Sequence, residues 1–156
     1  MRHGYDDKIV YRKMESQIQS FILTQFQLER LASLARDSLP NESCALLLSN
    51  NTNEENDIHV IETLSMKNSD ESPTTRFRID SQELINGYLR AEKMGLNVVG
   101  IFHSHPAPPI PSSTDKIFME INPVVWLIYS TLTNESRAYI FEQKKVREVR
   151  LSVIKE

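Results

Sequence analysis

The chain has 156 residues, of which 40% are hydrophobic and 25% are charged, and its formal net charge is −3. This composition is typical of one globular domain, and the negative charge argues against a nucleic-acid binder that neutralises phosphates. The single cysteine, Cys44, excludes an internal disulfide framework and fits a reducing compartment. No apolar run reaches the roughly 18 residues of a membrane span and no signal region is apparent, so we expect a soluble cytoplasmic protein.

Apolar periodicity and turn residues divide the chain into a flexible N-terminal tail, residues 1–14, and one domain over residues 15–156. In chain order, the domain is expected to contain a strand at 18–23, a helix between Thr24 and Pro40, strands at 43–48 and 58–64 that form a hairpin, a loop at 65–75, an extended piece at 77–79, a helix from Asp80 to Gly95, a strand at 96–102, a short helix from Ser113, and strands at 124–129, 138–141 and 146–154. This order predicts an α+β domain built on a mixed sheet.

Local signals predict where the two longer helices begin. Thr24 and Gln27 match a capping box, in which each side chain accepts a hydrogen bond from the other residue's backbone N–H. Asp80 and Glu83 repeat this pattern at the second helix. Gly95 is a natural residue to end that helix, because glycine readily adopts the left-handed conformation.

Two histidines two residues apart, His103 and His105, follow the apolar strand at 96–102. Side chains two residues apart on a strand point to the same side, so both imidazoles are expected to converge. Asp115 follows a proline-rich turn that can form neither a helix nor a central strand. Two nitrogen ligands and one oxygen ligand suit a divalent ion, zinc above others, and leave a fourth position for water. The pattern therefore predicts a hydrolytic metal site.

Such a site needs a base for the water and a donor for the developing oxyanion. Glu42, at the mouth of the strand at 43–48, is the best-placed carboxylate for the base. Ser112 precedes Asp115 by three residues, so both residues can lie on one turn near the ion. Removing a donor of this kind typically costs about a hundredfold or more in rate.

Structural roles compete with each of these assignments. The two histidines could bond to backbone groups on an edge strand, Glu42 could be a solvated loop acid, and Cys44 could be a reactive thiol rather than the buried hydrophobe that we favour. Ser112 could have no role beyond capping the next helix. Capping of this helix and catalysis by Ser112 are compatible if Ser113 or Thr114 provides the cap. His3 and His59 are assigned structural or solvated roles. The presence of all five residues together favours the metal site.

The run Glu42…His103-Ser104-His105-Pro106…Ser112-Ser113-Thr114-Asp115 resembles the JAMM motif of the MPN/Mov34 metalloproteases: a distant Glu, His-Ser/Thr-His-Pro, then Ser-x-x-Asp. Residues 40–48 are similar to the family's early segment, Pro-x-Glu-x-Cys-Gly followed by apolar residues, although Ala45 stands at the glycine. The interval from His105 to Ser112 is one residue shorter than in eukaryotic members. Residues 116–123 leave no room for a large insertion, as expected of a minimal prokaryotic or archaeal-type member. The resemblance covers roughly residues 16–154.

The resemblance implies an MPN-like, cytidine-deaminase-like fold with a curved, largely antiparallel sheet flanked by helices. It also implies that His103, His105 and Asp115 bind zinc, that Glu42 is the general acid and base, and that Ser112 is the oxyanion donor. The implied substrates are conjugates or C-terminal extensions of ubiquitin or of ubiquitin-like, sulfur-carrier-type proteins. Two alternatives stay open: an amidase that releases a small amine or amino acid from a carrier protein, and a non-catalytic scaffold in a larger complex. A homodimer or a partner complex also stays open.

Overall fold

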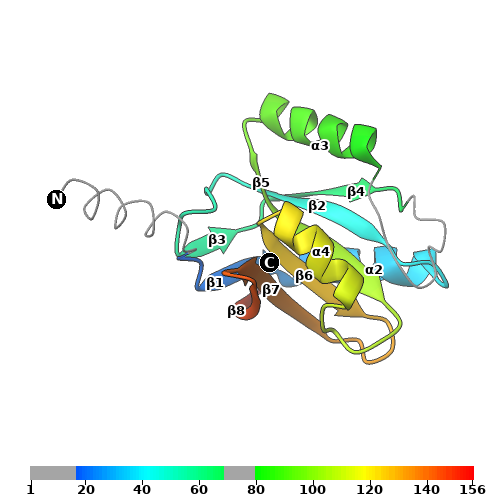
Figure 1. Cartoon of the computed structure of the whole chain (residues 1–156). Coiled ribbons are helices and arrows are strands. Elements are labelled where there is room, and N and C mark those ends of the chain that lie inside the picture. Colours follow the sequence, from blue (N-terminus) through cyan, green and yellow to red (C-terminus); the bar gives the residue numbers. More distant parts are fainter. Residues whose placement is uncertain (1–16, 69–79) are drawn as a thin grey trace.

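A computed structural model describes residues 17–68 and 80–156, which form a curled sheet with helices on both faces (Figure 1). The expected N-terminal tail, the extended piece at 77–79 and most of the loop at 65–75 lie outside the described residues. None of the described helices is long and apolar enough to cross a membrane.

The described part of the chain contains eight strands and three helices. They are β1 (Ser20–Thr24), α2 (Gln25–Ser38), β2 (Cys44–Ser49), β3 (Asp57–His59), β4 (Glu62–Met66), α3 (Ser81–Lys93), β5 (Asn97–His105), α4 (Ser113–Ile121), β6 (Val125–Ser130), β7 (Ser136–Glu142) and β8 (Lys145–Ile154). The strand order is β3-β1-β8-β7-β6-β5-β2-β4. β1 runs parallel to β3 and β8, and β5 runs parallel to β6, whereas the other described pairs are antiparallel. The predicted α+β domain on a mixed sheet is confirmed.

The predicted starts of α2 and α3 are confirmed, with one difference. At α2, the Thr24 hydroxyl accepts from the Gln27 N–H at 3.0 Å and the Gln27 side chain accepts from the Thr24 N–H at 2.9 Å. At α3, Asp80 caps the helix by accepting from the N–H groups two and three residues later. The Glu83 carboxylate instead accepts from the Lys67 N–H at 2.8 Å, because the end of β4 lies beside this turn. The second capping box is therefore not formed.

Both helices end where the sequence predicted. α2 ends shortly before Pro40, and α3 ends before Gly95, whose φ of 70° is left-handed. The Gly95 N–H donates to the Glu92 carbonyl at 3.0 Å, and the Leu96 N–H donates to the Ala91 carbonyl at 2.9 Å. These two bonds are the Schellman pattern, which satisfies carbonyls that the helix itself leaves unpaired.

The single strand predicted at 58–64 is wrong, because the structure divides it between β3 and β4. β3 pairs with β1 and β4 pairs with β2, at opposite ends of the strand order. Between them, the Val60 N–H donates to the Ile22 carbonyl at 2.9 Å and the Ile61 N–H donates to the Leu48 carbonyl at 2.7 Å. Because the sheet curls, one short segment of the chain can pair with β1 at one end of the strand order and with β2 at the other. Of the two strands, only β4 forms the antiparallel pair with β2 that was predicted for the whole segment.

The two faces of the sheet pack against different helices. Leu31 of α2 belongs to one buried cluster with Phe102, and Met119 of α4 belongs to a second cluster with Ile101. Ile101 and Phe102 are neighbours on β5, so their side chains point to opposite faces. The two histidines of β5 continue the Ile101 series at intervals of two residues, which directs them toward α4.

Candidate metal centre

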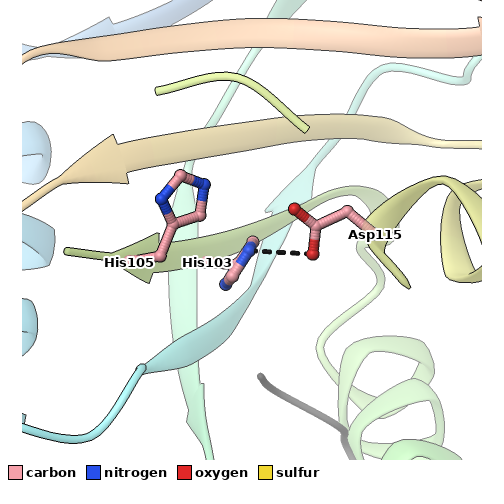
Figure 2. A group of neighbouring side chains, drawn as sticks. All are labelled: His103, His105 and Asp115. Atoms are coloured by element: carbon pink, nitrogen blue, oxygen red, sulfur yellow. Dashed lines mark ion pairs between the residues drawn. The ribbon is translucent and has the colours of Figure 1, made fainter. Parts of the chain in front are cut away.

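His103 and His105 lie at the end of β5, and Asp115 lies in the first turn of α4 (Figure 2). The three side chains offer one ligand atom each, and these atoms lie within 4.8 Å of one another. All three residues are buried, with exposed fractions of 1%, 7% and 3% in chain order. The structure thus brings together the three ligands that the sequence predicted, at a distance from which they can approach one ion.

Backbone pairing positions the histidines. β5 lies between β2 and β6, and His103 is paired with Cys44 on one side and Ile128 on the other. β5 is therefore a central strand here, not an edge strand. His103 Nε2 lies 3.0 Å from Asp115 Oδ1, which joins the end of the strand to the start of α4.

Ser112 itself caps α4, which is the structural role that the sequence left open for it, and neither Ser113 nor Thr114 supplies the cap. The Ser112 hydroxyl accepts from the Asp115 N–H at 3.1 Å, and the Ser112 N–H donates to Asp115 Oδ2 at 2.8 Å. A capping box needs a side-chain acceptor three residues after the cap. Asp115 provides this carboxylate when Ser112 is the cap, whereas Ser113 or Thr114 would have Lys116 or Ile117 at that position. Accepting a bond uses a lone pair of the hydroxyl and leaves its proton available to another acceptor. Capping and hydrogen-bond donation by Ser112 therefore use different parts of the same group.

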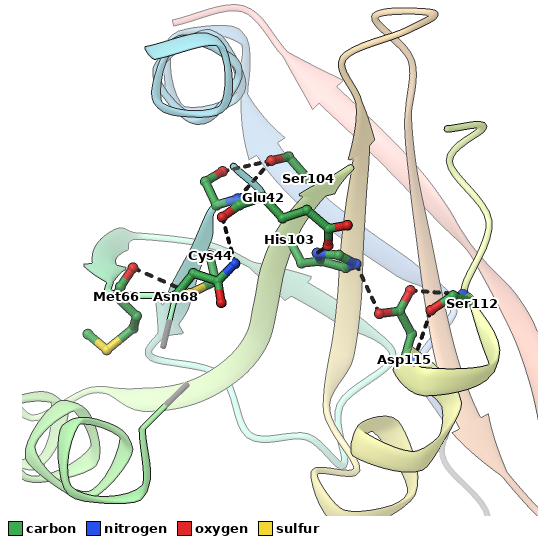
Figure 3. A network of polar contacts seen from close by, with 9 residues as sticks. Glu42, Cys44, Met66, Asn68, His103, Ser104, Ser112 and Asp115 are labelled. Atoms are coloured by element: carbon green, nitrogen blue, oxygen red, sulfur yellow. Dashed lines mark hydrogen bonds and ion pairs between the residues drawn. The ribbon is translucent and has the colours of Figure 1, made fainter. Parts of the chain in front are cut away.

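Glu42 precedes β2 and lies beside His103 (Figure 3). Its Oε1 is 3.3 Å from His103 Nδ1, and the residue is only 5% exposed, unlike a solvated loop acid. Glu42, His105 and Ser112 line one cavity of about 450 Å³, together with the proline-rich segment that connects β5 to α4. A substrate in this cavity would reach one predicted ligand, His105, together with the predicted base and the predicted oxyanion donor.

The electrostatics of the cluster favour metal-binding protonation states. Burial, and then the neighbouring His103, lower the pKa of the His105 imidazole below its ordinary value. Burial alone would raise the pKa of the Asp115 carboxyl, but His103 and the hydrogen bonds from Ser112 hold it below its usual range. Metal ligands must be neutral imidazole and ionised carboxylate, and both shifts favour those forms. The buried, preassembled donor set of two nitrogens and one oxygen therefore fits a zinc ion.

Two polar residues beside the site had no role assigned from the sequence. Ser104 lies between the two histidines and contacts the segment that carries Glu42, and Asn68 contacts Glu42 itself (Figure 3). The alternation of β5 could have indicated that Ser104 faces away from the histidines. Nothing in the sequence around Asn68 indicates its contact, which depends on how β4 pairs with β2.

The sequence matches, over residues 25–147, the family described as prokaryotic homologs of the JAB domain. The chain belongs to this family. The match confirms the predicted JAMM/MPN resemblance, and it spans every predicted site residue. It does not by itself assign their roles.

Three known proteins resemble the chain over much of its length. A protein named desampylase, from Pyrococcus furiosus, is 41% identical over 96 residues, which cover 60% of this chain and 67% of that protein. The solution structure of a Desulfitobacterium hafniense protein has a TM-score of 0.75 and 30% identity, covering 87% of this chain and 94% of that one. A Salinibacter ruber protein, with a TM-score of 0.62 and 24% identity, covers 86% and 90% and shares the fold alone. These likenesses confirm the predicted fold class.

Proposed function

We propose that the protein is a zinc-dependent isopeptidase that hydrolyses amide bonds after the C-terminus of ubiquitin-like proteins. The observation that carries the proposal is the buried cluster of His103, His105 and Asp115 with Glu42 in contact and a cavity open beside it. Membership of the JAB-domain family and the likeness to a protein named desampylase support the same reaction class.

His103, His105 and Asp115 would hold the zinc ion. When bound there, zinc would polarise the substrate carbonyl and lower the pKa of water toward roughly 7. The low exposure of all three residues limits competing water, which strengthens electrostatic interactions inside the site.

Glu42 acts as the proton carrier in this proposal. Its carboxylate takes a proton from the attacking water, the new carbon–oxygen bond forms, and Glu42 then delivers the proton to the leaving lysine amine as the carbon–nitrogen bond breaks. The products are the C-terminal carboxylate of the modifier and a free amine. Ser112 donates its hydroxyl proton in a hydrogen bond to the oxygen that becomes negative in the intermediate.

The cavity and the family both support this substrate class. The glycines that end such a tail carry no side chains, so nothing but the backbone has to fit the space between Glu42 and the proline-rich segment. Pairing of this tail with a neighbouring strand would fix its register by main-chain hydrogen bonds. The lysine side of the bond would then face the cavity opening.

The test compares the wild type with Glu42→Gln, which keeps the shape of the side chain and removes its basicity. Ubiquitin-like proteins joined through their C-termini to lysine serve as substrates, and zinc content is measured on the same samples. We expect about one zinc in both proteins and a loss of at least about a hundredfold in cleavage rate for the variant.

Three results would contradict the proposal in distinguishable ways. Zinc in both proteins without cleavage by either would favour a scaffold. Release of a small amine, with no cleavage of protein conjugates, would favour an amidase. Absence of zinc from both would overturn the metal site.

A further inference from the structure

The peptide group that joins Glu42 to Ser43 is held by side chains at both of its polar atoms. Its carbonyl oxygen, on Glu42, accepts from Asn68 Nδ2 at 2.9 Å (Figure 3). Its N–H, on Ser43, donates to Ser104 Oγ at 3.0 Å. This peptide precedes β2, which begins at Cys44, so the regular part of the sheet does not set its orientation.

Ser104 is placed for this contact by the alternation of β5. His103 and His105 point toward α4, so the side chain between them points to the opposite face. There the hydroxyls of Ser104 and Ser43 lie 2.8 Å apart, and the Ser104 N–H donates to the Ser43 carbonyl at 3.1 Å. Ser104 is 1% exposed and Ser43 is 5% exposed, so water cannot replace these bonds without opening the core.

A peptide group is planar, so holding its oxygen and its N–H fixes the plane. The plane in turn fixes the position of the Glu42 Cα, from which the side chain starts, and so limits where Oε1 can lie relative to His103 Nδ1, now 3.3 Å away. A misplacement of about 1 Å in a reacting group can cost on the order of a hundredfold in rate. We propose that Ser104 and Asn68 are positioning residues that aim Glu42 at the metal centre.

This inference rests on the proposed role of Glu42 as the base. Ser104→Ala removes the hydroxyl and leaves the backbone bonds of β5 in place. We expect kcat to fall about tenfold or more, with KM and zinc content unchanged, and Ser104→Thr to recover most of the loss because it restores a hydroxyl. Asn68→Asp, which keeps the side-chain shape but removes the N–H donor, should lower kcat in the same way.

Ser49→Ala is the matched control. Ser49 lies at the other end of β2, is fully buried, and donates its hydroxyl to the His59 carbonyl. Its removal costs a comparable buried bond far from Glu42. We expect Ser49→Ala to lower the melting temperature without changing kcat, which separates positioning from general stability.

A double-mutant cycle shows whether Ser104 acts through Glu42. In a Glu42→Gln background the base is already lost, so Ser104→Ala should change the residual rate little. An equal fold-loss in both backgrounds would overturn the inference, as would a wild-type kcat for Ser104→Ala.

Two readouts do not require activity. In zinc-loaded Ser104→Ala, we expect faster hydrogen exchange at the Ser43 amide and a longer distance between Glu42 and His103 in a crystal structure. If the wild type cleaves no substrate, the proposed function fails, but this distance still decides the positioning. An unchanged distance would overturn the inference by itself.

Discussion

His103 contacts a predicted metal ligand and the predicted base through the two nitrogens of its ring. Nε2 faces the Asp115 carboxylate at 3.0 Å and Nδ1 faces the Glu42 carboxylate at 3.3 Å. The ring is almost fully buried at the centre of the sheet, where neighbouring strands fix its backbone on both sides. One residue therefore sets the relative position of a predicted ligand and of the predicted base.

Cys44 lies on the neighbouring strand, paired with His103, but its thiol belongs to the core. The thiol donates to the Met66 carbonyl at 3.3 Å, and burial followed by the charge of Glu83 raises its pKa to about 12. Because the thiolate is the reactive form, we predict no reaction of the native protein with a thiol reagent at pH 8 and one equivalent after unfolding. Rapid labelling of the folded protein would contradict this assignment and favour the reactive thiol.

At the scale of elements, the ends of helices are set by contacts within a few residues. The Thr24 cap, the stop before Pro40 and the Gly95 turn each depend on neighbours in sequence, and all three were predictable. The absence of the second capping box could not be predicted in this way, because the Glu83 carboxylate accepts from the N–H of Lys67, which lies 16 residues earlier in the chain. The division of the predicted strand into β3 and β4 could not be predicted from local sequence either, since it depends on the curl of the whole sheet.

Gly95 gives a quantitative test of the end of α3. Among the described residues, a methyl added there meets no atom within 4 Å outside its chain neighbours, so the cost of Gly95→Ala is conformational. With φ at 70°, we predict a loss of about 1 kcal/mol in the free energy of unfolding, measured by urea denaturation. Gly95→Asn should lose less, because asparagine tolerates this conformation better. Equal stability of Gly95→Ala and the wild type would contradict the Schellman ending.

At the scale of the whole molecule, the candidate site joins segments far apart in sequence. Glu42 precedes β2, the histidines end β5, and Asp115 begins α4, so only the assembled sheet brings them together. The motif predicted these residues because their chemistry and spacing are explicit in the sequence. The contacts of Ser104 and Asn68 with the Glu42 peptide depend on sheet register, which no local pattern states.

The most direct test of the metal-dependent hydrolase is a zinc titration of chelator-treated protein, followed by cleavage of a ubiquitin-like protein joined to lysine. We predict no cleavage without metal, and recovery in proportion to added zinc up to one equivalent. Asp115→Asn keeps the size of the side chain but loses the charged ligand, so it should not recover at the same zinc concentrations. Full cleavage by metal-free protein, or normal recovery by Asp115→Asn, would contradict the proposed centre.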